Sequence, residues 1–382
     1  MEKELFALLR IGLHTEKTGD VPVSTFSELS QEKWLEIRKM ADYQSVSAIV
    51  FDGLSLLVNT FGKDGVAPHI DKGWWRQYVF DWMGVVTHTE QRNKQQLEVM
   101  NDLASQWTSQ GCRVMVFKGQ ACGMMYPHPE HRSPGDIDCY LMNDNEGRST
   151  KDEKQAEVYK RGNEIAREVG AKVNESWYKH SVISYRNESI ENHQYFVHTR
   201  EGRKSKQLNQ ILVDTLKVDA FDHIPGTEVL LPPVMFNAVF LTYHALAHFL
   251  EEGLRLKQIL DWSMFLKHDG DKVDWPEFYK ICDTFHFRRF ADVMMDIAVQ
   301  YLGVKVSGSK IQVSESPYTE KVLKSTLTDK DYVFASGQSG WANRWHIVRN
   351  LFKYRWKYHD IYQHSVFRQL WYYGIGFFFK TE

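Results

Sequence analysis

Cysteine is scarce in this chain, and long apolar runs are missing from it. The 382 residues include 4 cysteines, none of them in a CxxC pair, at positions Cys112, Cys122, Cys139 and Cys282. This usage argues against a secreted disulfide framework and favours free thiols in a reducing compartment. No stretch reaches the roughly 18 apolar residues of a membrane-spanning helix, and the first residues lack the apolar core of a signal peptide. We therefore expect a cytoplasmic protein with no membrane span.

An excess of one charge is also missing. The formal net charge is -2, so affinity for a polyanion would require a local basic patch. A hydrophobic fraction of 43% with 25% charged residues excludes a disordered chain. The aromatic share, 14% with 12 Trp, indicates either large packed surfaces or a groove for a flat ligand.

Apolar periodicity divides the chain into three regions. Residues 1–108 carry apolar residues three to four positions apart, the pattern of amphipathic helices, and residues 227–382 return to this pattern. Residues 109–226 instead contain short apolar runs typical of strands. We expect an α+β fold in which a small α/β core lies between an N-terminal and a C-terminal helical region.

The middle region contains the strongest strand signals. "CRVMVFKG", residues 112–119, is apolar and bounded by glycines, and "GDIDCYLM", residues 135–142, alternates charged and apolar side chains. A short helix and a Pro-rich loop separate the two runs. A charged helix is expected over residues 151–170, and a hairpin over residues 180–198 with its turn near residues 187–189.

Two carboxylates stand one residue apart in the second of these runs. Residues i and i+2 of a strand point the same way, so Asp136 and Asp138 are expected to share one face. Paired like charges are costly unless a cation shares them, and oxygen ligands suit Mg²⁺ or Mn²⁺. The first run ends at Lys118-Gly119, where a glycine and the following helix N-terminus would admit a phosphate. The pattern therefore predicts a metal site beside a phosphate site.

This segment resembles a known group of enzymes. "FKGQACGMMYPHPEHRSPGDIDCYL" is similar to the signature of the polymerase-beta-like nucleotidyltransferase superfamily, and more closely to a bacterial family of uncharacterised nucleotidyltransferases. "RKMADYQSVSAIVFDGL", "SIENHQ" and "HALAHFLEEGLRLKQILDW" extend the resemblance from Leu35 to Trp262. It implies a small mixed β-sheet core, bound Mg²⁺ or Mn²⁺, and transfer of an NMP from an NTP substrate to a hydroxyl of an acceptor.

The resemblance also implies a third carboxylate on an adjacent strand. Glu191 in "SIENHQYF" matches the family's position before a histidine, so Asp136, Asp138 and Glu191 are the expected catalytic and metal-binding residues. Asn192 departs from the apolar residue expected there. Asp219 in "LKVDAFDHI" is the competing choice, because it too has a strand-like setting.

Four residues are predicted to bind the nucleotide's phosphates: Lys118, Gly119, Gln120 and Arg132. Gln120 stands where the superfamily usually has a serine or a second glycine, so Lys118 would replace the missing hydroxyl as a point charge. Arg132 could hold phosphate oxygens bidentately, or it could clamp Asp136.

Three alternatives stay open at this stage. Gln120 and Asn192 motivate a catalytically degenerate nucleotide-binding or scaffold protein. His244 and His248, four residues apart on a predicted helix, motivate a zinc hydrolase. Residues 341–382 carry seven basic and two acidic residues among aromatics, which suits either an anionic partner or a packed basic helix. The sequence leaves open the transferred base, the oligomeric state, and whether the acceptor is a small molecule, RNA or protein.

Overall fold

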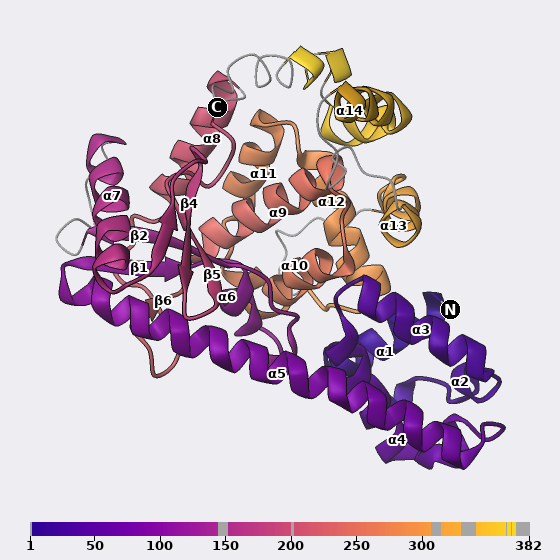
Figure 1. The fold of residues 1–382 in the computed structure, drawn as a ribbon. Helices are drawn as coiled ribbons and strands as arrows, with labels where there is room; N and C mark the ends of the chain where they lie inside the picture. Colours follow the sequence, from indigo (N-terminus) through magenta and orange to yellow (C-terminus); the bar gives the residue numbers. More distant parts are fainter. Residues whose placement is uncertain are drawn as a thin grey trace.

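The strands of this chain form one sheet, and helices precede, cover and follow it (Figure 1). The computed structural model describes residues 2–143, 152–199, 202–306, 315–329, 341–363, 365–367 and 369–371. The strands are β1 (Cys112–Val116), β2 (Ile137–Asn143), β3 (Lys172–Asn174), β4 (His180–Tyr185), β5 (Glu188–His193) and β6 (Val229–Leu230). The helices are α1 (Glu2–Gly12), α2 (Ser24–Ser27), α3 (Gln31–Tyr43), α4 (Ser47–Val66), α5 (Lys72–Ser109), α6 (Gly119–Gly123), α7 (Asp152–Glu168), α8 (Arg203–Asp214), α9 (Val234–Glu251), α10 (Leu256–Asp269), α11 (Trp275–Thr284), α12 (Arg288–Asp296), α13 (Thr319–Thr328) and α14 (Trp341–Lys353).

The sheet has the strand order β3-β4-β5-β2-β1-β6. Neighbouring strands are antiparallel except for the pairs β2 with β5 and β1 with β6, which are parallel. The expected α+β class with a small mixed sheet between helical regions is confirmed. The strand β6 belongs to this sheet although it lies beyond the predicted core of residues 109–226.

Helices cover both faces of the sheet because its central strands alternate between two apolar surfaces. Ile137, Cys139 and Leu141 of β2 point towards the C-terminal half of α5 and towards α7. The intervening Tyr140 faces the opposite layer, where it packs against Phe196. Helices α8 and α9 contribute to that second layer. Charged side chains at the ends of these strands therefore emerge on the side of α9.

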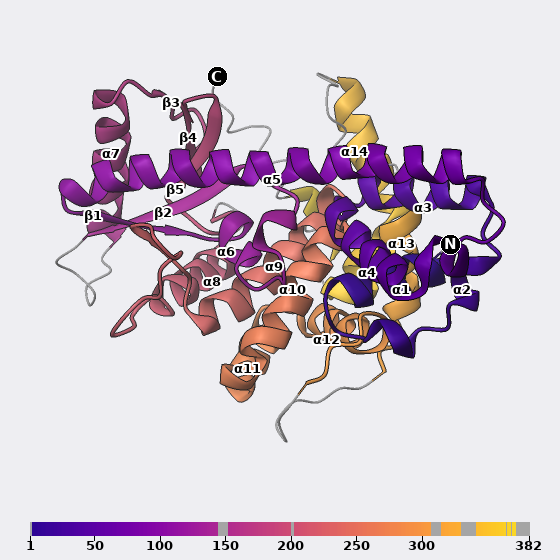
Figure 2. The same ribbon diagram turned by 90° about the horizontal axis from the view of Figure 1, so that it is seen from below.

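The long helix α5 connects the sheet to the N-terminal helices. It spans 38 residues, and Figure 2 shows it running along one side of the molecule from the α1–α4 cluster to the sheet. Its N-terminal half packs aromatic residues, since Trp82 lies against Tyr78 and the Tyr78 hydroxyl donates to the Trp34 carbonyl at 2.8 Å. Here the high aromatic content forms a packed core.

The β4–β5 hairpin closes with a two-residue turn. Tyr185 pairs with Glu188, and the intervening Arg186 and Asn187 have φ values of 46° and 67°. Two consecutive positive φ values are those of a type I′ turn, whose twist matches that of the flanking strands. The predicted hairpin is confirmed, but its turn precedes the predicted position at residues 187–189 because Glu188 already belongs to β5.

The cysteines agree with a further expectation. All four cysteines are free and buried. Among the described residues, no helix is both long enough and apolar enough to cross a membrane.

Part of the basic C-terminal region can be placed. Lys357 is buried, with its ammonium 3.3 Å from Asp329 and 4.6 Å from the centre of the Phe249 ring. This lysine belongs to a packed surface and is not free to bind a polyanion. The rest of the predicted basic region lies partly outside the described residues. This holds for Arg368, for residues 372–382 with Lys380 and Glu382, and for the side chain of Arg344.

His131, in the loop between α6 and β2, links that loop to α4 and α5. His131 contacts Asp52 of α4 through Nδ1 at 2.8 Å and Glu90 of α5 through Nε2 at 2.9 Å. Burial alone would lower the pKa of His131, but the hydrogen bonds to both carboxylates outweigh it and raise this pKa from 6.5 to about 9. The protonated imidazole therefore stabilises the fold below about pH 6.5, and this contribution is lost as the pH rises through 9.

We expect His131→Gln to lower the free energy of unfolding by about 2 kcal/mol at pH 6, a value reduced from the full pKa shift because the cluster is partly solvated. The difference from wild type should shrink towards zero by about pH 9.5. Urea unfolding at both pH values measures it, with His69→Gln as the control, since His69 is exposed. An equal loss at both pH values would contradict the ionic role of His131.

Candidate active site

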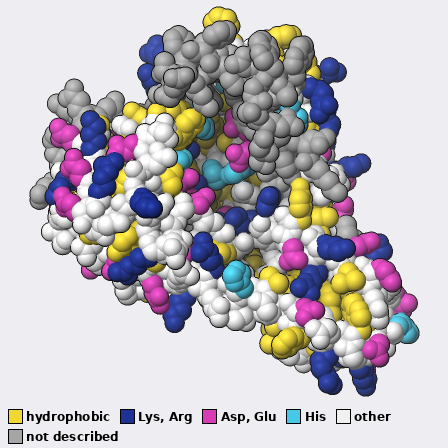
Figure 3. Space-filling model, in the orientation of Figure 1, with side chains coloured by type: hydrophobic (Ala, Val, Ile, Leu, Met, Phe, Trp, Pro, Cys, Tyr) yellow, Lys and Arg dark blue, Asp and Glu magenta, His cyan; other side chains and the backbone are white. Residues whose placement is uncertain are grey.

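A polar cavity opens beside β2, which lies between β1 and β5 in the sheet. Its volume is about 410 Å³, and it is lined by Lys118, Gly119, Asp136, Asp138, Lys179, Glu191, His193, His244, His248 and Lys257 among others. Figure 3 shows a hollow near the centre of one face of the molecule, in which acidic, basic and histidine side chains gather. The cavity brings the predicted carboxylates and cations to one place.

The register of the sheet brings two of the carboxylates together. Asp138 of β2 is the direct neighbour of Glu191 in the parallel β5 strand. Side chains of directly paired residues lie on the same face of a sheet. The amide of Phe117 donates to the Asp138 carbonyl at 3.1 Å, which holds the end of β1 against the same residue. The backbone thus fixes the spacing between these carboxylates.

Asp138 is buried and strongly paired. Its Oδ1 atom lies 2.6 Å from the Lys118 ammonium and 3.0 Å from Nε2 of His193. Burial would raise the pKa of Asp138, but the charge of Lys118 and the hydrogen bond from His193 outweigh it and hold this pKa well below its usual range. Asp138 therefore remains a carboxylate at neutral pH.

Asp136 lies on the exposed side of the same cavity, directly before β2. Its partial burial and the negative charges of Glu191 and Asp138 raise its pKa. The ammonium groups of Lys118 and Lys257 oppose this shift without cancelling it. A carboxylate destabilised by neighbouring carboxylates marks a position that favours an added cation.

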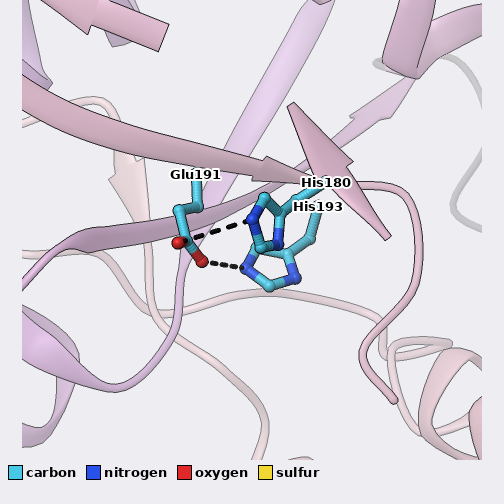
Figure 4. A group of neighbouring side chains, drawn as sticks. All are labelled: His180, Glu191 and His193. Carbon is cyan, nitrogen blue, oxygen red and sulfur yellow. Dashed lines mark hydrogen bonds and ion pairs between the residues drawn. The ribbon is translucent and has the colours of Figure 1, made fainter. Parts of the chain in front are cut away.

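Glu191 contacts two histidines, as Figure 4 shows. Its Oε2 atom lies 3.2 Å from Nε2 of His193, and its Oε1 atom lies 3.5 Å from Nε2 of His180. Burial would raise the pKa of Glu191, but the hydrogen bond from His193 outweighs burial and lowers it. The competing residue, Asp219, is exposed in a bend and not in a strand, and it does not line the cavity. The strand-like setting predicted for Asp219 was wrong, because α8 and its following turns occupy that part of the chain.

The end of β1 has an unusual backbone. Lys118 has φ 62° and ψ -148°, and Gly119 follows with φ 36°. The first conformation is ordinarily restricted to glycine, and side chains held there are often functional. The strained turn presents the Lys118 ammonium to Asp138. Helix α6, which begins at Gly119, has only five residues.

Two predicted phosphate-binding residues have protein partners. The Gln120 amide donates to Gln96 of α5 at 2.6 Å, and Gln120 does not line the cavity. Arg132 lines the cavity, but its guanidinium is buried and bonds both oxygens of Asp261 at 3.1 and 2.8 Å. Tyr126 donates to the same carboxylate at 2.8 Å. Arg132 thus clamps Asp261 of α10, and the predicted clamp on Asp136 is not formed.

Two residues that line the cavity, Lys179 and Lys257, were missed at the sequence level. So was His180, which contacts Glu191. The ammonium of Lys257, on α10, lies close to Gly135, the residue before Asp136. Its charge acts on the Asp136 carboxylate. Burial and the nearby charge of Arg132 lower the pKa of Lys257 to about 8. Lys257 belongs to "LRLKQILDW", the downstream helix quoted for the family resemblance, so that helix was the available signal.

His244 and His248 line the cavity from α9. Their Nε2 atoms lie 3.1 Å apart, so one imidazole donates to the other, and His248 also contacts Glu252 at 3.1 Å. A catalytic zinc site has three protein ligands. Over the described ranges, the residues whose metal-ligand atoms converge are His180, Glu191 and His193, and this group does not include His244 or His248.

Comparison with known proteins adds one relationship. The sequence model of a family described as uncharacterised nucleotidyltransferase matches residues 30–303. The matched span includes the whole of the cavity's lining and extends past the predicted limits of the resemblance. No curated protein and no solved structure matches the chain.

Proposed function

The chain belongs to the uncharacterised nucleotidyltransferase family, and from this premise we propose that it transfers the NMP unit of an NTP to a hydroxyl of an acceptor. The observation that carries the proposal is that Asp136, Asp138 and Glu191 line one cavity together with Lys118 and Lys257. Nucleotidyl transfer needs metal-binding carboxylates close to cations that accept phosphate charge. The cavity supplies both kinds of group.

The donor set fits a divalent cation. Three carboxylates of the cavity provide the oxygen ligands that Mg²⁺ and Mn²⁺ take, and Asp136 is destabilised by the charge of its neighbours. Asp136, Asp138 and Glu191 would hold the ion. When bound, it would offset the charge of the triphosphate and lower the pKa of the acceptor hydroxyl.

The chain's own residues have separate tasks in this proposal. Lys118 and Lys257, which line the cavity with the carboxylates, bind the triphosphate oxygens. The acceptor oxygen attacks the α-phosphorus while the bond to the bridging oxygen breaks, so that pyrophosphate leaves and a cluster carboxylate takes the hydroxyl proton. Lys118 exchanges its contact with Asp138 for the phosphate, since both are anions within reach of one ammonium.

The two residues that motivated a degenerate protein lie away from the carboxylates. Asn192 is buried on the opposite face of the sheet, where its amide donates to Asn163 at 2.9 Å. Gln120 bonds to Gln96. Both unusual residues therefore have structural partners, and neither supports loss of activity.

Replacing Lys257 tests the phosphate side of the cavity. We expect Lys257→Met to raise the KM for the NTP by about 10- to 100-fold, because a charged hydrogen bond contributes about 1.5–3 kcal/mol. Pyrophosphate release is measured with each of the four NTPs, Mg²⁺ and a cell extract that supplies the acceptor. Lys280→Met is the control, because that lysine is exposed on α11. A KM equal to that of wild type would remove Lys257 from the phosphate site.

A further inference from the structure

Nitrogen ligands lie beside the carboxylates at one edge of the cavity. His180 and His193 are direct partners in the antiparallel β4–β5 ladder, and Glu191 lies two residues before His193 on the same face. Their ligand atoms all lie within 4.8 Å of one another. Figure 4 shows both imidazoles directed at the Glu191 carboxylate.

The separations match those around a single metal ion. Two ligand atoms that are each about 2.1 Å from a tetrahedral zinc ion lie about 3.4 Å apart. Oε2 of Glu191 lies 3.2 Å from Nε2 of His193, and Oε1 lies 3.5 Å from Nε2 of His180. Glu191 and each histidine are therefore spaced as two ligands of one ion would be.

Both ring nitrogens of His193 face hydrogen-bond acceptors. Nδ1 of His193 faces the Tyr195 carbonyl at 3.2 Å, and Nε2 faces carboxylate oxygens of Asp138 and Glu191 at 3.0 and 3.2 Å. All three partners only accept hydrogen bonds. A metal ion between Nε2 and the carboxylates would satisfy the contacts of Nε2 while Nδ1 donates its proton to the Tyr195 carbonyl. A carbonyl on Nδ1 is the usual outer partner of a metal-bound histidine, because it directs the lone pair of Nε2 at the metal.

His180, the strand partner of His193, has a ring nitrogen without a hydrogen bond in the described part of the chain. This atom, Nδ1, is buried. No bond therefore holds the ring in place other than the contact of its Nε2 atom with Glu191.

We propose that His180, Glu191 and His193 form a mixed nitrogen and oxygen site for a first-row transition ion of the Zn²⁺ type. Imidazole ligands suit such ions, whereas Mg²⁺ prefers oxygen ligands. Glu191 is shared with the Asp136 and Asp138 position, so the cavity holds two positions of different metal preference. The metal position at Asp136 and Asp138 rests on the proposed function, but metal binding at the histidines does not.

Cobalt titration of the full chain tests this site. The protein is freed of metal with a chelator and titrated with Co²⁺, whose visible absorption reports its ligands. We expect one equivalent to produce the absorption of a low-coordinate nitrogen and oxygen site, to be displaced by Zn²⁺, and to persist in excess Mg²⁺. His180→Ala should weaken binding by at least about 100-fold, at or beyond the upper end of the loss of about 10- to 100-fold caused by mutating outer partners. His268→Ala is the control, since His268 is largely exposed on α10.

Each outcome supports or overturns the metal site. Absence of the absorption in wild type, or equal Co²⁺ affinity in His180→Ala, would overturn the proposal. If His180→Ala does not fold, His180→Gln replaces it, because its amide can still contact Glu191. Pyrophosphate release is followed in parallel with Mg²⁺ as the added metal. Release without a cobalt site overturns this inference alone, and a cobalt site without release overturns the proposed function alone.

Discussion

Replacing Asp138 with asparagine is expected to lower the rate of nucleotide transfer by about 100- to 1000-fold, the usual cost of removing one group that stabilises charge in a transition state. Asp138 is the most buried of the three carboxylates, and its charge faces both Lys118 and His193. Asparagine keeps the shape of the side chain but removes the charge on which metal binding depends. The rate is measured as pyrophosphate release at saturating NTP.

The matched control for this variant is Asp219→Asn. Asp219 is exposed outside the cavity, so its loss should leave the rate unchanged. Circular dichroism and thermal unfolding establish that Asp138→Asn is folded at the assay temperature. Wild-type turnover in a folded Asp138→Asn protein would contradict the role of the carboxylate cluster.

Removing the guanidinium of Arg132 is expected to destabilise the fold by about 3–5 kcal/mol, the range for breaking one partner out of a buried ion pair. Arg132 and Asp261 are both buried, and their bidentate contact joins the loop before β2 to α10. Arg132→Met would leave the Asp261 carboxylate with the Tyr126 hydroxyl and the charge of Lys257, without its directly bonded guanidinium. Urea unfolding at neutral pH measures the loss.

A double variant separates this structural role from phosphate binding. In Arg132→Met/Asp261→Leu no charge is left unpaired, so most of the lost stability should return. Arg161→Met, which removes an exposed arginine of α7, is the control and should change stability by less than about 1 kcal/mol. Unchanged stability in Arg132→Met together with a raised KM for the NTP would show that Arg132 binds phosphate as first predicted.

Local patterns were sufficient to place the strands that carry the carboxylates. The alternation of "GDIDCYLM" sets Asp138 on the face opposite Ile137 and Cys139, and the structure has this arrangement. The family resemblance selected Glu191 over Asp219, and the parallel register puts Glu191 beside Asp138. The sequence could not show that register, because the pairing of two strands distant in the chain depends on the packing of the whole sheet.

Partners from distant elements could not be predicted in the same way. Asp261 lies 129 residues from Arg132, and no local spacing connects the two. Gln120 was assigned to phosphate by its position after Gly119, but Gln96 of α5 lies close enough to bond it. Lys257 reaches the cavity because α10 packs beneath the loop that Arg132 anchors. Tertiary packing decides the role of each of these polar side chains.

The proposed nucleotidyl transfer is tested most directly by the fate of two labels. Purified protein is incubated with an NTP labelled at the α-phosphate or at the γ-phosphate, with Mg²⁺ or Mn²⁺ and a cell extract. We predict that the α-label becomes attached to an acceptor, that the γ-label appears in pyrophosphate, and that Asp138→Asn loses both products. Attachment of the γ-label, or binding of the NTP with neither label transferred, would contradict the proposed function.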